Sequence, residues 1–386
     1  MADREKQAGA VLTIDLGALR RNYRLLRSLA AGAQCGAAVK ADAYGLGAIP
    51  VAQALAAEGC RHFFVAHLDE GIALRPHLPA DADVFVLHGT LPDAEAEFIE
   101  HRLIPVLNSA CQVAGWRQAA RDAGRQLPAA VQVDTGMSRL GLSRTEVGNW
   151  LDDPDFLRGI ELRFLMSHLA CAERQDHPMN GAQLEAFHAL RKVLPRARAS
   201  FANSSGIFLG PEYHFDLVRP GAALYGIAPI HGAPNPMAPV VTLQAKVIQT
   251  RVIERGECVG YGATYRAAGQ RRIATIAAGY ADGWLRSLSG RGYALAGDVR
   301  LPVVGNVSMD TFALDVTDVP PERMHAGAFV DLISAAQPVD EVAAHAGTIA
   351  YEILTSLGGR YHREYVDEQP APQSQEAARE SIELSI

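Results

Sequence analysis

The sequence lacks the features of several classes of protein. Its 386 residues contain five cysteines, an odd number without CxxC spacing, so we expect reduced thiols and neither a disulfide framework nor a zinc site. No apolar run approaches the ~20 residues of a membrane-spanning helix, which argues against a membrane protein. The first residues, MADREKQAGA, are polar, so we predict no secretory signal and a cytoplasmic location. The net charge of −7, without Lys/Arg blocks, argues against nucleic acid as a partner.

Short apolar runs alternate with amphipathic stretches from about residue 15 to residue 220. Runs such as CGAAVK, FFVAH and VFVLHG predict strands, and SACQVAGWRQAARDAG has the i, i+3, i+4 spacing of a helix. Eight strand–helix units in this length fit a TIM-type (β/α)8 barrel better than an open sheet. The open, doubly wound alternative usually carries GxGxxG after its first strand, and KADAYGLG does not match that pattern.

The pattern changes at a Pro- and Gly-rich segment, GIAPIHGAPNPMAPVV. Beyond it, β-type segments separated by glycine turns predict a second, mainly β domain. We therefore expect an α/β protein with a barrel at residues 15–236 and a β domain at 237–366, which a strand at 11–14 joins. The polar stretch 367–386 is expected to be a mobile tail.

Polar residues stand where the predicted barrel strands end. In a (β/α)8 barrel these ends meet at one mouth, where active sites lie. One polar residue at a strand end usually marks only the point where the strand meets solvent, but several together indicate a site. The residues at these ends are Lys40, His67, His88, Asn108, Asp134, His168, Asn203 and Arg219.

Lys40 ends a run of small apolar residues. Desolvation in such surroundings lowers the pKa of a lysine, and the neutral amine attacks aldehydes to form a Schiff base. Downstream, ANSSG and RPGAALYG offer hydroxyl and backbone N–H groups that can hold a phosphate. This combination indicates pyridoxal 5′-phosphate (PLP) as the cofactor and no metal. Arg219 beside the pyridine nitrogen would leave that nitrogen unprotonated, which favours rapid return of a proton to the α-carbon.

Nine motifs in order resemble those of the fold-type III, PLP-dependent alanine racemases. They extend from about residue 11 to residue 366 and read AVKADAYGLG, VDTGMSRLG, SHLA, FANSSG, RPGAALYG, GYGATYRA, AAGYADG, VGNVSMD and YEILTSLG. The resemblance implies an isomerase that interconverts L- and D-alanine and supplies D-alanine for peptidoglycan. It also implies a head-to-tail homodimer whose active sites are shared between subunits.

The resemblance assigns the proton transfers to two residues. Lys40 would hold PLP and act as one base, and Tyr265 of the other subunit would be the second. Two bases are needed because racemisation removes the α-proton from one face and returns a proton to the other. Tyr265 would need cationic neighbours to act as a base, and the family suggests a chain from it through His168 to Arg219. Without the family, Tyr265 reads as an ordinary turn tyrosine.

Binding roles also follow from the resemblance. Phosphate would be held by Tyr44, Ser204, Gly221, Ala222 and Tyr351, with Asn203 close by. Arg139 would contact the cofactor phenolate and the substrate carboxylate, a charge-assisted contact. The backbone N–H of Met309 would meet that carboxylate, Asp310 would support its loop, and Tyr280 and Glu173 would line the approach to the site.

Three positions depart from the family pattern. Gln132 stands where many members carry a carbamylated lysine that holds the Arg139 equivalent, so we expect the Gln132 amide or a bound chloride to position Arg139. Asn306 replaces an arginine of several members, and Glu173 replaces the usual aspartate. These changes leave a broader, serine-accepting racemase open as an alternative.

Two further alternatives have recognisable features. A metal-dependent lyase, decarboxylase or dehydratase of the same fold type would carry a His/Cys pair in its β domain, whereas His325, His345, His362 and Cys258 are scattered. A non-catalytic PLP carrier would lack the β domain and Tyr265. For a racemase we expect supply of D-alanine for peptidoglycan before degradation of alanine, although the sequence does not separate biosynthetic from catabolic use.

Overall fold

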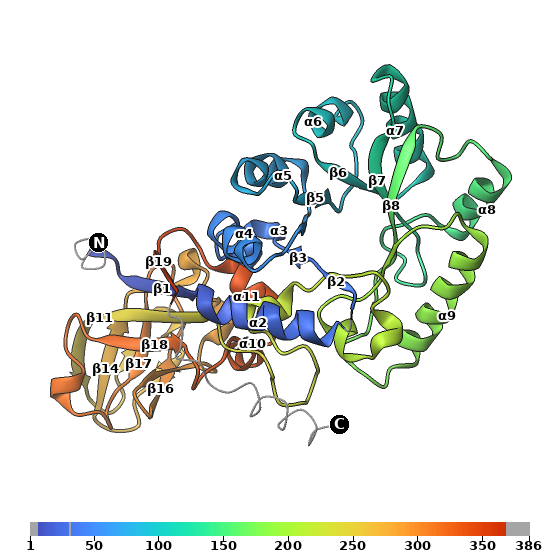
Figure 1. The fold of residues 1–386 in the computed structure, drawn as a ribbon. Helices are drawn as coiled ribbons and strands as arrows, with labels where there is room; N and C mark the ends of the chain where they lie inside the picture. Colours follow the sequence, from blue (N-terminus) through green and yellow to red (C-terminus); the bar gives the residue numbers. More distant parts are fainter. Residues whose placement is uncertain (1–6, 31, 368–386) are drawn as a thin grey trace.

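The computed structural model describes residues 7–30 and 32–367, and it shows two units side by side (Figure 1). One is a ring of parallel strands surrounded by helices. The other is a mainly antiparallel sheet that includes both the first and the last strand of the described chain. The predicted mobile tail, apart from Asp367, lies outside the described residues.

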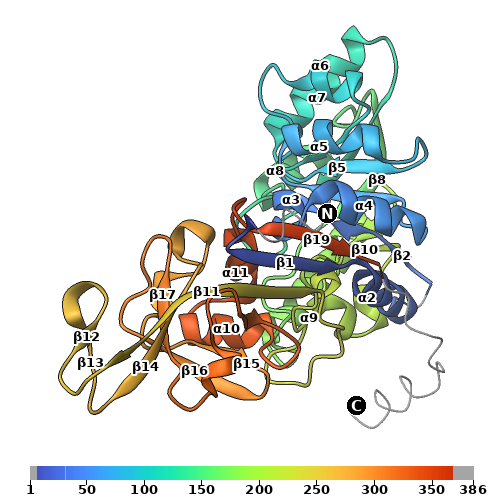
Figure 2. The same ribbon diagram turned by 90° about the vertical axis from the view of Figure 1, so that its left-hand side faces the viewer.

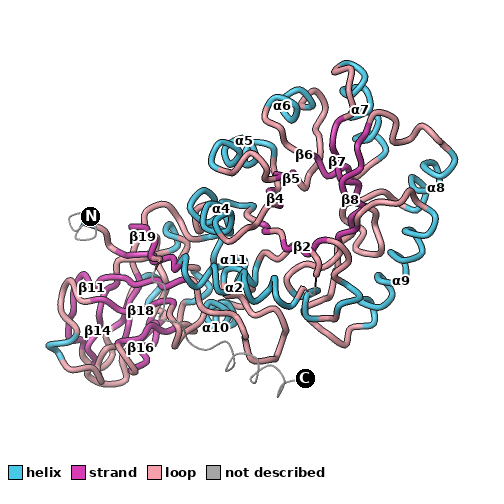
Figure 3. Tube along the Cα trace, in the orientation of Figure 1, coloured by secondary structure: helices cyan, strands magenta, loops and turns pink. Residues whose placement is uncertain are grey.

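The parallel sheet closes into a ring of eight strands, as Figure 3 shows. Its order is β2-β10-β9-β8-β7-β6-β5-β4-β3, and β2 and β3 are two halves of one strand interrupted by Gly36. The segments are β2 (Gln34–Cys35), β3 (Ala37–Ala38), β4 (His62–Val65), β5 (Asp83–Val86), β6 (Ile104–Leu107), β7 (Leu127–Gln132), β8 (Ile160–Met166), β9 (Ala199–Ser200) and β10 (Leu217–Val218). The barrel predicted from the strand–helix alternation is confirmed.

Helices surround this ring. They are α2 (Leu16–Leu29), α3 (Lys40–Gly45), α4 (Ala48–Ala57), α5 (Leu68–Leu74), α6 (Glu95–Glu100), α7 (Ala110–Asp122), α8 (Arg144–Asp152) and α9 (Pro178–Val193). Side chains cap several of them: Asp15 Oδ1 accepts the N–H of Ala18 at 2.8 Å, and Ser143 and Glu146 form a reciprocal capping box. In the described part of the chain, no helix combines the length and apolarity needed to cross a bilayer.

Apolar side chains fill the inside of the ring. The rings of Phe64 and Phe85 stack with centroids 4.9 Å apart, and Phe164 meets Phe85 edge to face at 5.9 Å. The cluster comprises Ala38, Phe64, Phe85, Ile104, Val106, Ala130, Phe164, Met166 and Leu217. The barrel is therefore a packed core and not a pore, so a ligand can only bind beyond one end of it.

The second unit is organised around one long strand, β11 (Val241–Ile253). Its first half pairs with β1 and β18, and its second half, after an irregularity at Val247/Gln249, pairs with β14. The other strands are β1 (Ala10–Asp15), β12 (Cys258–Val259), β13 (Tyr265–Arg266), β14 (Arg271–Ile276), β15 (Tyr293–Ala296), β16 (Val299–Val304), β17 (Phe312–Asp315), β18 (Phe329–Ile333) and β19 (His362–Val366). Two helices that the sequence analysis did not assign, α10 (Val339–Ala346) and α11 (Ala350–Ser356), complete it.

Two contacts fix this unit against the barrel. α11 packs against α3 so closely that a Cβ on Gly45 would lie 2.5 Å from the carbonyl oxygen of Leu354. Asn22, only 2% exposed on α2, donates to the carbonyl oxygens of Leu224 and Ala238 at 3.1 and 2.9 Å, and accepts the N–H of Ala238 at 2.7 Å. One buried amide thus joins the first barrel helix to the segment that leads into β11.

Replacing Asn22 with alanine should destabilise the fold, because it leaves three backbone groups without their partner. We expect the free energy of unfolding to fall by about 2 kcal/mol or more. Urea unfolding followed by circular dichroism, at one protein concentration, measures this. Gln118→Ala on the exposed side of α7 is the control and should change stability by less than about 0.5 kcal/mol. Equal midpoints for the two variants would contradict the role of Asn22.

Candidate active site

A cavity of about 720 Å³ opens at the carboxyl ends of the barrel strands, a volume typical of small-molecule sites. Its wall is formed by residues near the carboxyl ends of most of the barrel strands and by Tyr351 of α11. The sequence-predicted residues that line it are Lys40, Tyr44, Gln132, Arg139, His168, Asn203, Ser204, Arg219, Gly221, Ala222 and Tyr351.

Lys40 begins a turn whose backbone is left-handed. Residues 41–44 have φ values between 53° and 58°, although none is glycine. Each such residue costs about 1–2 kcal/mol, so the turn persists only because its surroundings hold it. Glu70 Oε1 accepts the N–H of Ala41 at 2.5 Å, and Oε2 accepts the N–H of Ala66 at 2.7 Å. The carboxylate of Glu70 therefore ties the lysine turn to the end of β4.

The surroundings of Lys40 favour its neutral form. Burial lowers the pKa of this lysine, and the positive charge of Arg139 lowers it further. The negative charge of Glu70 acts in the opposite direction. A lysine with a lowered pKa is a nucleophile towards carbonyl compounds and a base towards acidic C–H bonds.

Arg219 is a buried cation at the base of the cavity. Its Nη1 donates to Ser200 Oγ at 2.5 Å, and its Nη2 donates to the carbonyl oxygen of Ser167 at 2.8 Å and lies 3.4 Å from His168 Nδ1. Burial lowers the pKa of Arg219 to about 10, so the group stays cationic near neutral pH. Burial, followed by the charge of Arg219, lowers the pKa of His168 to about 3, so this imidazole is neutral.

Backbone N–H groups form a cup where β9 and β10 end, and β10 pairs with β2, the first half of the strand that leads to Lys40. Ser204 Oγ accepts the N–H groups of Gly221 and Ala223 at 2.9 and 3.1 Å. The N–H groups of Ser205 and Ala222 meet no acceptor in the described chain, although both residues are buried and line the cavity. Unpaired buried N–H groups are rare, and neighbouring ones form a site for an anion such as phosphate.

Tyr44 adds a hydroxyl to this cup. Its ring packs against those of Tyr225 and Tyr351, with centroids 4.7 and 6.0 Å away. A Cβ on Gly221 would lie 2.4 Å from Tyr44 Oη, so glycine is needed for the hydroxyl to approach the cup. Burial raises the pKa of Tyr44, which keeps the hydroxyl protonated as a hydrogen-bond donor. A phosphate cup facing a neutral lysine fits PLP.

The remaining predicted residues do not line this cavity. They are Glu173, Tyr265, Tyr280, Asn306, Met309 and Asp310. Tyr265 lies half-buried on β13, in the small β12–β13 ribbon that Figure 2 shows at the end of the β unit away from the barrel. Met309 and Tyr280 are 54% and 43% exposed. The chain by itself does not bring Tyr265 to Lys40.

Other residues on the cavity wall had no predicted role. They are Ala38, Ala41, Phe64, Ala66, Leu87, His88, Leu140, Ser205 and Thr355. His88 meets the ring of His67 edge to face at 4.4 Å, and burial, followed by the charges of His67 and Lys40, lowers its pKa. The sequence marked both histidines as strand ends. Their contact could be foreseen only once β4 and β5 were known to be neighbours, whereas Ser205 was visible in the ANSSG motif.

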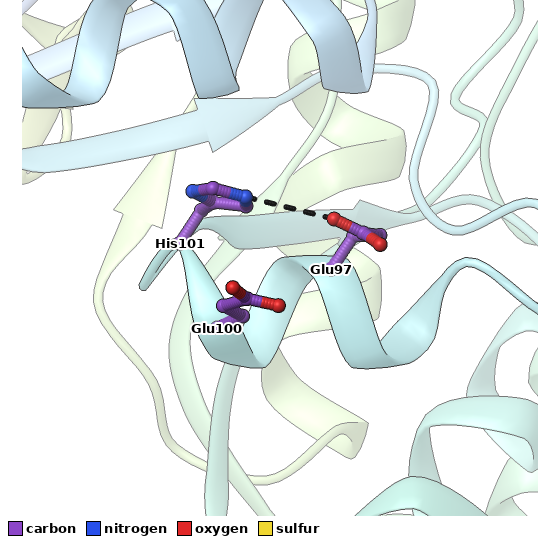
Figure 4. A group of neighbouring side chains, drawn as sticks. All are labelled: Glu97, Glu100 and His101. Carbon is purple, nitrogen blue, oxygen red and sulfur yellow. Dashed lines mark ion pairs between the residues drawn. The ribbon is translucent and has the colours of Figure 1, made fainter.

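A possible metal-binding cluster lies elsewhere. Figure 4 shows Glu97 and Glu100 on α6 and His101 directly after it, where His101 Nε2 lies 3.5 Å from Glu97 Oε2. The two glutamates are exposed, and none of the three residues lines the cavity. An ion pair on a helix surface accounts for this arrangement.

Comparison with known proteins gives one consistent family. The chain matches the model for the alanine racemase N-terminal domain over residues 14–229 and the model for its C-terminal domain over residues 240–365. "Alanine racemase, catabolic" of Mesorhizobium japonicum is 56% identical over 94% of both chains. Alanine racemase of Brucella abortus is 49% identical over 94% of this chain and 95% of its own.

Solved structures agree with the sequence relatives. The crystal structure of alanine racemase from Bartonella henselae with covalently bound pyridoxal phosphate superimposes with a TM-score of 0.90 at 42% identity, covering 93% of this chain and 100% of that one. Biosynthetic alanine racemase from Pseudomonas aeruginosa gives a TM-score of 0.86 at 36% identity, covering 93% and 99%.

The electrostatics of Lys40 can be tested by acylation of the apoprotein over a range of pH, with mass spectrometry of the modified peptides. Half-maximal reactivity of Lys40 should occur below ~10.4, the value of a free lysine side chain. Arg139→Gln should move this midpoint upward, because a cation is lost, and Glu70→Gln should move it downward, because an anion is lost. Midpoints that do not move in these opposite directions would contradict the assignment.

Proposed function

The chain belongs to the alanine racemase family, and from this we propose that it racemises alanine with two bases, its own Lys40 and Tyr265 of the partner subunit. It is an alanine racemase that uses PLP, the cofactor bound covalently in the Bartonella henselae relative. When bound, PLP withdraws electrons from the α-carbon of the amino acid and makes its proton acidic. The observation that carries the proposal is the desolvated Lys40 facing the cup of N–H groups.

The residues of the cavity would divide the binding between them. The N–H groups of Ser205 and Ala222 and the hydroxyl of Tyr44 would hold the phosphate. Arg219, fixed by Ser200 and by the backbone of Ser167, would face the pyridine nitrogen as a hydrogen-bond donor. Such a donor would leave the nitrogen unprotonated, and PLP held in this way would favour rapid return of a proton to the α-carbon.

A second base is required because the proton must return on the opposite face. Groups in the cavity are poorly suited: His168, with a pKa of about 3, is a weak base, and burial raises the pKa of Tyr44. We propose that the contacting face of the β unit carries Tyr265, which is half-buried on β13, together with Tyr261 and Met309, which are 77% and 54% exposed. A head-to-tail homodimer would bring this face to the cavity of the other subunit.

The substrate carboxylate would be held by charge and by backbone. Arg139 lines the cavity, and neither its guanidinium nor the buried amide of Gln132 makes a side-chain hydrogen bond within the described residues. The Gln132 carbonyl or a chloride ion is therefore free to position Arg139. The N–H of Met309 likewise meets no acceptor in the described chain and would serve the carboxylate from the partner subunit.

The supporting residues of the Met309 loop have visible partners. Asp310 accepts Arg360 Nη1 at 2.7 Å, and the same guanidinium binds both carboxylate oxygens of Asp282. Asn306 Nδ2 donates to the carbonyl oxygen of Tyr261 at 2.8 Å. We propose that these contacts, with Tyr280 and Glu173, shape the approach to the shared site and its preference between alanine and serine.

L- and D-alanine have equal free energies in water. The net direction of their interconversion in the cell therefore depends on which enantiomer other reactions consume. Supply of D-alanine for peptidoglycan is one proposed role. Degradation of alanine is the other proposed role. It is supported by two relatives, 56% and 51% identical to this chain, whose names specify a catabolic enzyme. Both roles use the same site and the same chemistry.

Incubation of the PLP-loaded protein with L-alanine in D₂O tests the activity. We expect exchange of the α-proton, followed by NMR, together with D-alanine, measured by chiral chromatography. Lys40→Ala should lower both rates by about 10³-fold or more. L-serine in parallel measures the breadth of the specificity. Exchange without inversion would refute the second base, and absence of both would refute racemisation of alanine.

Mixed dimers test the shared site. Lys40→Ala and Tyr265→Phe chains are each expected to be inactive, but a heterodimer regains one intact site. Random mixing in equal amounts should restore about a quarter of wild-type activity, because half of the dimers are mixed. Each variant refolded alone is the control. If His88 were the second base, Tyr265→Phe would stay active by itself, and no recovery in proven heterodimers would refute sharing.

A further inference from the structure

A second cavity, of about 570 Å³, lies where α9 ends and the chain returns to β9. We call it the basic basin; its polar lining is His188, Arg191, Lys192, Arg196, Arg198 and Asp216. Arg198 directly precedes β9, and Asp216 directly precedes β10. The basin therefore lies at the amino ends of the parallel strands, at the opposite end of the barrel from Lys40.

The charge of the basin is opposite to that of the protein. The chain has a net charge of −7, yet four cationic side chains and one carboxylate line this cavity. Asp216 Oδ2 accepts the N–H of Ala199 at 2.7 Å, so part of that carboxylate is already engaged. Within the described residues, Arg191, Lys192 and Arg196 form no ion pair.

Stabilisation of the helix accounts for only part of this cluster. Arg191 and Lys192 lie in the last turn of α9, where cations interact favourably with the helix dipole. Arg196 and Arg198 lie beyond the helix, on the loop into β9, where that effect has faded. Four like charges around one hollow repel each other, and an anionic ligand would offset that repulsion.

Two of the arginines are already held in place. The Cζ of Arg191 lies 5.0 Å above the ring of Phe215, and the Cζ of Arg198 lies 4.6 Å above the ring of Phe164. Arg198 also donates to Gln34 Oε1. Stacking restricts a guanidinium while leaving N–H edges for a ligand, and those edges match the spacing of phosphate oxygens.

We propose that the basic basin binds a small, multiply charged phosphate compound, such as pyrophosphate or a phosphate ester, at a site separate from the catalytic cavity. The volume exceeds that of a single phosphate and falls in the range of small-molecule sites. Leu165, Pro195 and Ala197 supply an apolar wall for the remainder of an ester. This inference does not depend on the two-base mechanism.

Isothermal titration calorimetry with inorganic pyrophosphate tests the proposal, using the PLP-loaded, full-length protein so that the catalytic phosphate cup is filled. Ionic strength is held constant and metals are removed. Wild-type protein should bind one pyrophosphate per chain, more tightly than orthophosphate. In the double variant Arg191→Gln/Arg196→Gln the Kd should rise at least about tenfold. Circular dichroism tests whether this double variant is folded. If the double variant does not fold, the single variant Lys192→Gln, at an exposed residue of the basin, replaces it.

The matched control is Arg125→Gln, which removes an exposed arginine just beyond α7 that forms no ion pair with any residue the structure describes. Its Kd should equal that of the wild type. The proposal would be overturned if the basin variants bound pyrophosphate with the same Kd as the wild type. It would also be overturned if Arg125→Gln raised the Kd as much as the basin variants do, because pyrophosphate would then be attracted to positive charge anywhere on the surface. Absence of binding at millimolar pyrophosphate would also overturn it.

Discussion

The position of Lys40 depends on the carboxylate of Glu70. This one group accepts the N–H groups of Ala41, Ala66 and His67, and so holds a left-handed turn that would otherwise be unfavourable by about 1–2 kcal/mol per residue. Packing of Gly45 against α11 supports the same turn from the other side. The strained residues directly follow Lys40, and the conformation in which they are held determines where its amine lies.

Burial and positive charge together set the protonation of Lys40 and His168 in the cavity. Burial is the larger cause of both lowered pKa values; the charge of Arg139 adds to it at Lys40, and the charges of Arg219 and Arg139 add to it at His168, so both groups are favoured in the neutral form. In the proposed function, Arg139 would also hold the substrate carboxylate. Glu70 moderates the effect on Lys40, since its charge raises the pKa that burial lowers. One electrostatic arrangement therefore serves both the binding of anions and the supply of a neutral base.

The two units of the chain contribute to the site in different ways. The β unit supplies Tyr351 to the cavity of its own barrel, through the close contact of α11 with the lysine turn. Tyr265 and Met309 belong to the same unit but lie apart from that cavity. Their position accords with the proposed dimer, in which each β unit faces the barrel of its partner. Rigid attachment through Asn22 and α11 would keep both contributions aligned.

The sequence by itself determined the barrel, the β domain and most of the residues around the cavity, because periodicity and short motifs are local properties. Lys40, Arg219 and Ser204 could be placed at one mouth because parallel strands end on the same side. Only the tertiary structure decided the left-handed turn, the His67–His88 contact, the unpaired N–H groups of Ser205 and Ala222, and the separation of Tyr265 from Lys40. Each of these depends on which segments pack together and which acceptors remain for a given N–H group, and sequence spacing does not specify either.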